Sequence, residues 1–174
     1  MKLLGAIIAG GKATRFGADK GAALLDGKAL IDHVAAGLCR QTDALIICGR
    51  AWPGLDTVDD RPEPGLGPLG GLCGALLHAK MHGFDAVLTA GCDVLPIPDS
   101  LAEALGAGPA CVAGQRLLGV WPSSLAPLLE QHLSSSGDRS IWSWIKLCGA
   151  TEIQFETDWH NINTTADLDH LARQ

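Results

Sequence analysis

The sequence has 174 residues, the length of a single globular domain that can bury a hydrophobic core without disulfides or structural metals, and we expect residues 1–174 to form one domain. Hydrophobic residues make up 47% of the chain and charged residues 18%, a balance that excludes disordered and fibrous proteins. The net charge of -6 argues against a surface for duplex nucleic acid, because affinity for a polyphosphate backbone comes from clustered Lys and Arg.

The sequence also predicts a cytoplasmic protein that crosses no membrane. Its apolar segments are shorter than the ~20 residues of a membrane-spanning helix. The apolar opening segment leads straight into a glycine-rich cationic loop, unlike a signal peptide. The six cysteines are scattered without a Cys-x-x-Cys pair, which indicates small buried side chains in a reducing compartment. We expect a monomer or a weak oligomer.

Short apolar runs of strand length alternate with longer stretches of helical period, the arrangement that is typical of βαβ units. In chain order the pattern predicts a strand over residues 3–9, a helix over 30–38, a strand over 44–48, a helix over 69–81, a strand over 84–90, a helix that begins near residue 100, short strands over 110–113 and 117–121, helices over 122–133 and 140–147, a strand over 151–155 and a capped helix over 164–172. The predicted fold class is α/β, with a mostly parallel sheet covered on both faces by helices.

The loop that follows the first predicted strand has the composition of a phosphate-binding site. It begins with Gly10-Gly11 and carries Lys12, Arg15 and Lys20. Adjacent glycines let the backbone approach a ligand and turn several N–H groups toward one point. The alternative is an ordinary strand-to-helix turn with solvated cations. The glycines and three cations together favour phosphate binding at this loop.

Two familiar phosphate motifs do not explain this loop. A P-loop has a glycine, four further residues and then Gly-Lys-Ser/Thr. Gly5 and Gly10 fit this spacing, but Gly11 stands where the lysine belongs. The dinucleotide fingerprint matches residues 65–70 as a bare pattern, but this segment follows a proline-rich loop instead of the first strand. The loop therefore belongs to another class of phosphate site.

A carboxylate follows the strand predicted over residues 84–90. Asp93 comes just past the end of that strand, at the edge of the sheet where α/β proteins bind ligands. Mg²⁺ binds few carboxylates and keeps its other positions for water and substrate phosphates. The alternative is an Asp that caps a strand-to-helix turn.

Residues 8–20 also contain a longer pattern, Ile-Ala-Gly-Gly at the start, Arg-Phe-Gly in the middle and Asp-Lys at the end. This pattern resembles the signature loop of the molybdenum cofactor guanylyltransferases, which belong to the nucleotidyltransferase superfamily. Further matches follow in order at Gly67-Pro68-Leu69-Gly70-Gly71-Leu72, Cys92-Asp93-x-x-Pro96, Gly119-Val120-Trp121 and Asn161-Ile162-Asn163-Thr164, and they span nearly the whole chain. The related cytidylyltransferases more often have Ala-Gly and Pro-Lys at the two ends of the loop.

The resemblance implies a fold and a reaction. The fold is a Rossmann-like three-layer α/β/α arrangement. In the reaction, which depends on Mg²⁺, the terminal phosphate of molybdopterin attacks the α-phosphate of GTP and pyrophosphate leaves. Because the nucleophile is already an anion, the reaction needs charge neutralisation and in-line positioning rather than a general base. This agrees with the lack of a convincing Ser-His-Asp or Cys-His constellation in the sequence.

The resemblance also implies roles for particular residues. The catalytic residues are Arg15, Lys20 and Asp93, with Asp93 as the Mg²⁺ ligand. The nucleotide contacts are Ile8, Ala9, Gly10, Gly11, Lys20, Cys48, Asp60 and Asp93. The acceptor contacts are Arg139, Asn161 and Asn163. The plainer interpretations are a solvated turn for Asp60, a surface cation for Arg139 and a helix cap for the two asparagines.

One position departs from the family pattern. Guanylyltransferases usually carry Asn at the end of the second strand, where it can read the base, and Cys48 stands there in this chain. A thiol is a poor substitute for a carboxamide in hydrogen bonding, so guanine selectivity must come from backbone groups or from elsewhere in the pocket, or be relaxed. Two alternatives stay open: a cytidylyl- or sugar-phosphate nucleotidyltransferase, and a non-catalytic nucleotide-binding module.

Overall fold

The structure, a computed structural model, describes residues 1–10, 19–135 and 138–173. Its strands are β1 (Leu3–Ile8), β2 (Leu24–Leu25), β3 (Lys28–Ala29), β4 (Ala44–Cys48), β5 (Asp56–Val58), β6 (Ala86–Gly91), β7 (Val94–Leu95), β8 (Ala110–Val112), β9 (Gln115–Pro122), β10 (Thr151–Ile153) and β11 (His160–Asn161). Its helices are α1 (Leu30–Cys39), α2 (Pro68–Met81), α3 (Leu101–Leu105), α4 (Ala126–Ser135), α5 (Ile141–Cys148) and α6 (Thr165–Leu171), with short 3-10 helices η1 (Lys20–Ala22) and η2 (Ser123–Leu125).

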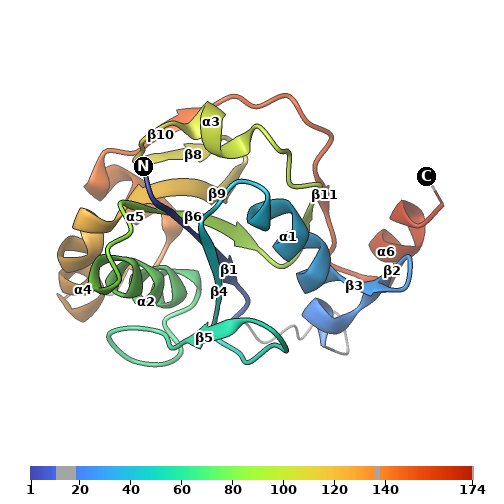
Figure 1. The fold of residues 1–174 in the computed structure, drawn as a ribbon, viewed down its shortest axis with the longest axis horizontal. Helices are drawn as coiled ribbons and strands as arrows, with labels where there is room; N and C mark the ends of the chain where they lie inside the picture. Colours follow the sequence, from blue (N-terminus) through green and yellow to red (C-terminus); the bar gives the residue numbers. More distant parts are fainter. Residues whose placement is uncertain (11–18, 136–137, 174) are drawn as a thin grey trace.

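A seven-stranded sheet runs through the centre of the protein in the order β10-β8-β9-β6-β1-β4-β5 (Figure 1). β1 pairs in parallel with β4 on one side and β6 on the other, and β5 continues the parallel arrangement beside β4. β10 is parallel to β8, whereas β9 runs antiparallel to β6 and β8. The prediction of an α/β fold with a mostly parallel central sheet is confirmed.

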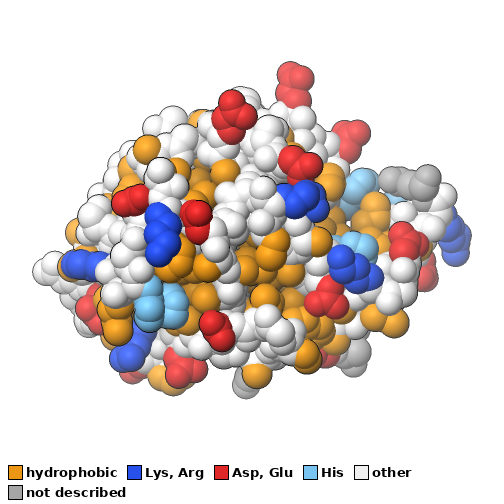
Figure 2. All heavy atoms as spheres, in the orientation of Figure 1, with side chains coloured by type: hydrophobic (Ala, Val, Ile, Leu, Met, Phe, Trp, Pro, Cys, Tyr) orange, Lys and Arg blue, Asp and Glu red, His pale blue; other side chains and the backbone are white. Residues whose placement is uncertain are grey.

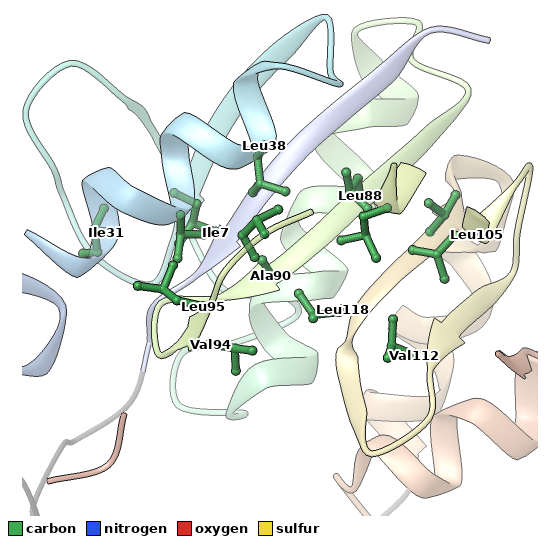
Figure 3. Close-up of a cluster of buried hydrophobic side chains, with 14 of the residues drawn as sticks. Ile7, Ile31, Leu38, Leu88, Ala90, Val94, Leu95, Leu105, Val112 and Leu118 are labelled. Atoms are coloured by element: carbon green, nitrogen blue, oxygen red, sulfur yellow. The ribbon is translucent and has the colours of Figure 1, made fainter. Parts of the chain in front are cut away.

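Alternate residues of β1 belong to separate cores on the two faces of the sheet. Leu3 and Ile7 lie in a cluster with α1 and α3, whereas Leu4 and Ile8 lie in a cluster with α2, α4 and α5. Figure 3 shows part of the first cluster, where Leu38 of α1 joins Ile7. Every residue of β1 is buried, which explains why the strand is a continuous apolar run in the sequence.

The described elements differ from the predicted ones in a few places. The helix predicted over residues 122–133 begins at Ala126, because β9 continues through Pro122 and η2 then turns the chain. β5 and the short pairs β2–β3 and β7–β11 are not predicted from the sequence. These strands have two or three residues each and lack a sustained apolar period.

The charged side chains on the surface and the lengths of the helices relate to the expectations about nucleic acid and membranes. On the face drawn in Figure 2, acidic and basic side chains are interspersed rather than gathered by sign. Among the described residues, no helix is long and apolar enough to cross a bilayer. The expectations of one domain and of no nucleic-acid partner stay predictions.

Candidate nucleotide-binding and catalytic site

The carboxyl ends of β1, β4, β5 and β6 meet at one edge of the sheet, and two adjoining clefts open there. The large cleft has a volume of about 1150 Å³ and is lined by the loops after β1, β4 and β5. The small cleft, of about 260 Å³, lies between the ends of β1 and β6. Gly10 and Arg50 line both clefts. Because β1 has β4 on one side and β6 on the other, the clefts lie where the strand order reverses, which is where open α/β sheets bind ligands.

A close backbone contact joins the loops after β1 and β4. A Cβ atom on Gly49 would lie 2.4 Å from the Cα of Gly10, and Gly49 has a φ of 85°. The Ala9 N–H donates to the Cys48 carbonyl oxygen at 3.0 Å, which ties the two loops together. From the sequence, Gly10 is expected to let a ligand approach the backbone closely. The structure adds a second reason, since the neighbouring loop leaves little room beside Gly10.

Gly49→Ala is expected to lower the free energy of unfolding by about 1–3 kcal/mol, because the methyl group would overlap Gly10 and a residue with a Cβ is strained at positive φ. Gly54→Ala is the matched control, with a φ of 80° and open space around its Cβ position. Chemical denaturation measures both variants. Equal losses would show that only the backbone conformation matters and that the contact with Gly10 does not.

Three polar residues singled out from the sequence meet at the small cleft. Lys20 Nζ donates to Asp93 Oδ2 at 2.8 Å and to Asn163 Oδ1 at 2.9 Å. The Lys20 side chain is 15% exposed and that of Asp93 is 33% exposed. The pair is therefore partly shielded from water, where charges interact more strongly than on an open surface. Asp93 lies between β6 and β7, just past the end of β6, and Asn163 comes from the segment before α6.

The segment that carries Asn163 is held by backbone pairing. β11 pairs with β7, and the Ile162 N–H donates to the Asp93 carbonyl oxygen at 2.9 Å. The Ile162 side chain is fully buried, so the alternation of an extended chain turns Asn161 and Asn163 away from the core. Asn163 is not the cap of α6, since the side chain of Thr164 caps this helix.

A third cleft, of about 310 Å³, adjoins the small cleft at Asp93. Asn161 and Arg116 line it. The Arg116 Nε donates to Glu152 Oε1 at 2.5 Å, and its guanidinium lies 4.3 Å from the centre of the Trp142 ring. Arg116 is not predicted from the sequence as a site residue, because the cleft forms only when β9 and β11 come together.

Arg50 is a second cation at the site that is not predicted from the sequence. Its Nη1 and Nη2 atoms donate to the two carboxylate oxygens of Asp19, both at 2.5 Å. These hydrogen bonds raise the pKa of Arg50 and lower that of Asp19. One signal in the sequence could have found Arg50. It closely follows a predicted strand, at the edge where the ligands of α/β proteins bind.

Asp60 lines the large cleft. Its Oδ1 atom is buried and has no hydrogen-bond partner among the described residues. Burial raises the pKa of this carboxyl group. A buried acceptor without a hydrogen-bond partner costs stability, so this oxygen indicates a group that receives its hydrogen bond from a ligand.

Comparison with known proteins agrees with this geometry. Residues 5–152 match the family model described as the MobA-like NTP transferase domain. The chain belongs to this family. Molybdenum cofactor guanylyltransferase from Acidiphilium cryptum is 30% identical over 177 residues, covering 94% of this chain and 90% of the relative. The protein of the same name from Cereibacter sphaeroides is 34% identical over 183 residues, covering 97% and 94%.

A solved structure shares the fold. Molybdopterin-guanine dinucleotide biosynthesis protein A from Archaeoglobus fulgidus superimposes with a TM-score of 0.73 at 20% identity, over 98% of this chain and 97% of that one. The MobA-like chain is therefore a nucleotidyltransferase by family and has a nucleotidyltransferase fold.

The first loop of this MobA-like protein is described in part. Ile8, Ala9 and Gly10 line the small cleft, in keeping with their predicted contact to a nucleotide. Gly11 and Arg15 lie outside the described residues. Their predicted roles in binding the nucleotide and in catalysis stay predictions.

Two predicted contacts are placed away from the clefts. The Cys48 side chain is fully buried in the core beside α2, and burial raises the pKa of its thiol to about 12. This corrects the expectation that Cys48 meets the nucleotide, because its thiol faces the core. Arg139 is exposed in the segment just before α5 and is not among the described residues that line the three clefts. Its predicted contact with the acceptor has no support from the geometry.

Asp93 is the group best placed to bind the divalent metal with which nucleotidyltransferases work. The described residues contain no cluster of three or more His, Cys, Asp or Glu side chains that could hold a metal ion. A single carboxylate beside a cleft does not make a structural metal site. It suits an ion that takes most of its ligands from water and substrate phosphates, as Mg²⁺ does. The donor set thus fits a metal that binds together with a polyphosphate.

Proposed function

We propose that this chain transfers GMP from GTP to the terminal phosphate of molybdopterin, releases pyrophosphate and depends on Mg²⁺. The observation that carries the proposal is the pair of Lys20 and Asp93, 2.8 Å apart, where the small cleft meets the third cleft. Phosphoryl transfer needs a cation and a metal ligand at the point where two substrates meet. The relatives named molybdenum cofactor guanylyltransferase support this choice of substrates.

Each cleft takes one part of the two substrates. The guanosine lies in the large cleft and the triphosphate crosses into the small cleft, since the two clefts adjoin at Gly10 and Arg50. The acceptor enters the third cleft, which reaches Asp93. An oxygen of its terminal phosphate bonds to the α-phosphorus while the bond from that phosphorus to the bridging oxygen breaks. The bonding electrons leave with pyrophosphate, and no proton has to be removed from the nucleophile.

The protein contributes charge and position to this step. Asp93 holds the Mg²⁺, which neutralises phosphate charge when it is bound. Lys20 neutralises charge on the α-phosphate, and Asn163 orients the Lys20 ammonium group at 2.9 Å. Asn161 offers its amide to the acceptor phosphate from the wall of the third cleft. Arg116 lines the same cleft and is better placed than Arg139 to meet the acceptor.

Asp60 reads the base in this proposal. A carboxylate can accept hydrogen bonds from both N1–H and N2–H of guanine, whereas cytosine presents an acceptor at N3 in that place. Asp60 lines the large cleft and carries an oxygen without a partner among the described residues, so it supplies acceptors that the Cys48 thiol cannot.

Asp60→Asn is expected to lower kcat/KM for GTP relative to CTP by about 10- to 100-fold, because an amide offers one acceptor where the carboxylate offers two. The melting temperature at pH 7 is expected to rise. Burial raises the pKa of Asp60, so its charge costs stability above that pKa, and asparagine carries no charge. The gain should shrink as the pH falls through the raised pKa, where the wild-type carboxyl group is protonated.

Asp56→Asn is the control for this variant, since Asp56 is an exposed carboxylate on the neighbouring edge strand β5. Turnover of GTP and CTP and thermal melts between pH 4 and 7 measure both effects. An unchanged ratio of GTP to CTP turnover in Asp60→Asn would show that another group selects the base.

The activity itself is tested by incubating the protein with molybdopterin, Mg²⁺ and GTP, CTP or ATP, and identifying the product by mass. A guanine dinucleotide formed only with Mg²⁺ is the expected result. A cytosine dinucleotide would instead make the chain a cytidylyltransferase, and binding without release of pyrophosphate would make it a non-catalytic module.

The expected cytoplasmic location is supported by the six cysteines, which are unpaired in the structure.

A further inference from the structure

Arg50 stands where the large cleft, proposed for the nucleoside, adjoins the small cleft, proposed for the triphosphate. It lines the large cleft beside Asp60 and the small cleft beside Lys20. A nucleoside triphosphate that spans the two clefts must therefore pass this guanidinium. With the α-phosphate at Lys20 and Asp93, the two outer phosphates occupy the rest of the small cleft, whose wall includes Arg50. They carry most of the charge of the ligand, so they attract this guanidinium.

The present partner of Arg50 is one that a phosphate can replace. Asp19 accepts from both Nη atoms in the side-by-side geometry that a carboxylate shares with a phosphate. The side chains are 28% exposed for Arg50 and 47% exposed for Asp19. An ion pair this accessible to water contributes little, so a more highly charged phosphate can displace the carboxylate. In addition, the Arg50 Nε atom is buried without a partner among the described residues.

The position of Arg50 does not depend on Asp19 alone. Its guanidinium lies 5.2 Å from the centre of the Trp52 ring. The indole N–H of Trp52 in turn donates to Asp32 Oδ1 on α1 at 2.7 Å. The ring is thus anchored to α1, and it keeps the guanidinium near the clefts when the ion pair with Asp19 breaks.

We propose that Arg50 binds the β- and γ-phosphates of the nucleoside triphosphate, exchanging Asp19 for phosphate, and holds pyrophosphate as it leaves. This inference rests on the proposed function, because it needs a triphosphate in the clefts. Without nucleotide, the two cations are balanced by Asp93 and Asp19. With nucleotide bound, the phosphates replace these carboxylates as the partners of Lys20 and Arg50, and Asp93 is then free to bind the metal.

Arg50→Gln tests the proposal by isothermal titration with GTP, GMP and pyrophosphate, each with Mg²⁺. We expect the affinity for GTP and for pyrophosphate to fall about 10- to 100-fold and the affinity for GMP to change less than about twofold, since GMP lacks the two outer phosphates. Arg50→Lys keeps the charge but loses the planar guanidinium. Its affinity for GTP and for pyrophosphate should lie between those of wild type and Arg50→Gln. Equal losses for GTP and GMP, or no loss for GTP, would overturn the proposal.

Asp19→Asn should not weaken the affinity for GTP, in contrast to Arg50→Gln. Because Asp19 competes with phosphate for Arg50, this variant should bind GTP as tightly as wild type or about two- to fivefold more tightly. A loss as large as that of Arg50→Gln would mean that the ion pair itself shapes the site, which contradicts the exchange. Thermal melts confirm that each variant is folded. If wild type binds no GTP, the proposed function fails, whereas if wild type transfers GMP and Arg50→Gln keeps its affinity for GTP, only this inference fails.

Discussion

Asp93→Asn is expected to lower kcat for guanylyl transfer by about 10²- to 10³-fold, the largest effect of any single change considered for this protein. Asp93 lies where the small and third clefts meet, so its metal would serve both the triphosphate and the acceptor. Among the described residues, no cluster of three or more metal-binding side chains could hold the ion in place of Asp93. A neutral amide binds Mg²⁺ weakly but can still accept the hydrogen bond from Lys20, so the fold should be kept.

A titration of activity with Mg²⁺ distinguishes loss of the metal from general damage. The variant should need more Mg²⁺ for half-maximal activity than wild type, while its melting temperature stays close to that of wild type. Asp99→Asn is the control, because Asp99 also forms an ion pair, with Arg40 at 2.6 Å, but lies away from the three clefts. Full activity of Asp93→Asn at the usual Mg²⁺ concentration would refute the assignment of the metal ligand.

Lys20→Ala is expected to lower kcat/KM about 10- to 100-fold or more, since one hydrogen bond to a charged group contributes ~1.5–3 kcal/mol. Lys20 is mostly buried and donates to both Asp93 and Asn163. Its removal leaves phosphate charge uncompensated, and it also leaves the Asp93 carboxylate without the cation that balances it in the free enzyme.

Single-turnover measurements at saturating GTP separate the two consequences, because they report the chemical step apart from nucleotide binding. A loss in the single-turnover rate assigns Lys20 to the transferred phosphate, and a loss confined to KM assigns it to ground-state binding. Lys28→Ala on β3, where the lysine is exposed, is the control for loss of a positive charge. Unchanged guanylyl transfer in Lys20→Ala would remove Lys20 from the catalytic residues.

The parts of the fold that could be predicted are those in which a single segment carries its own signal. β1 and β6 are buried along their whole length and, apart from Thr89 in β6, contain no polar side chain, so each strand is visible without its neighbours. Asp93 could be found because it closely follows β6, and Lys20 because it lies in the glycine-rich cationic loop after β1. β7 and β11 carry no such signal, since two-residue strands become visible only through the pairing of Val94 with Asn161.

The parts of the site that were missed or misplaced depend on which face or which neighbour a side chain meets. Cys48 is the last residue of β4, and its direction is set by strand alternation, which places it with Ile46 against α2. Arg50 is one of 13 Lys and Arg residues, and its place just after a predicted strand is its one distinguishing mark in the sequence. Its place between two clefts follows from β1 and β4 lying side by side, which is a property of the sheet order.

The pairing of β11 with β7 also has a consequence for the order of events during synthesis. A nascent chain that has left the ribosome as far as β10 already contains every strand of the central sheet and can bury much of its interior. Asn163, the partner of Lys20 that Ile162 anchors, emerges later. Translation thus delivers a folded scaffold first and a complete catalytic centre afterwards, so chains that terminate early would hold the nucleotide clefts without the full set of groups that carry out the transfer.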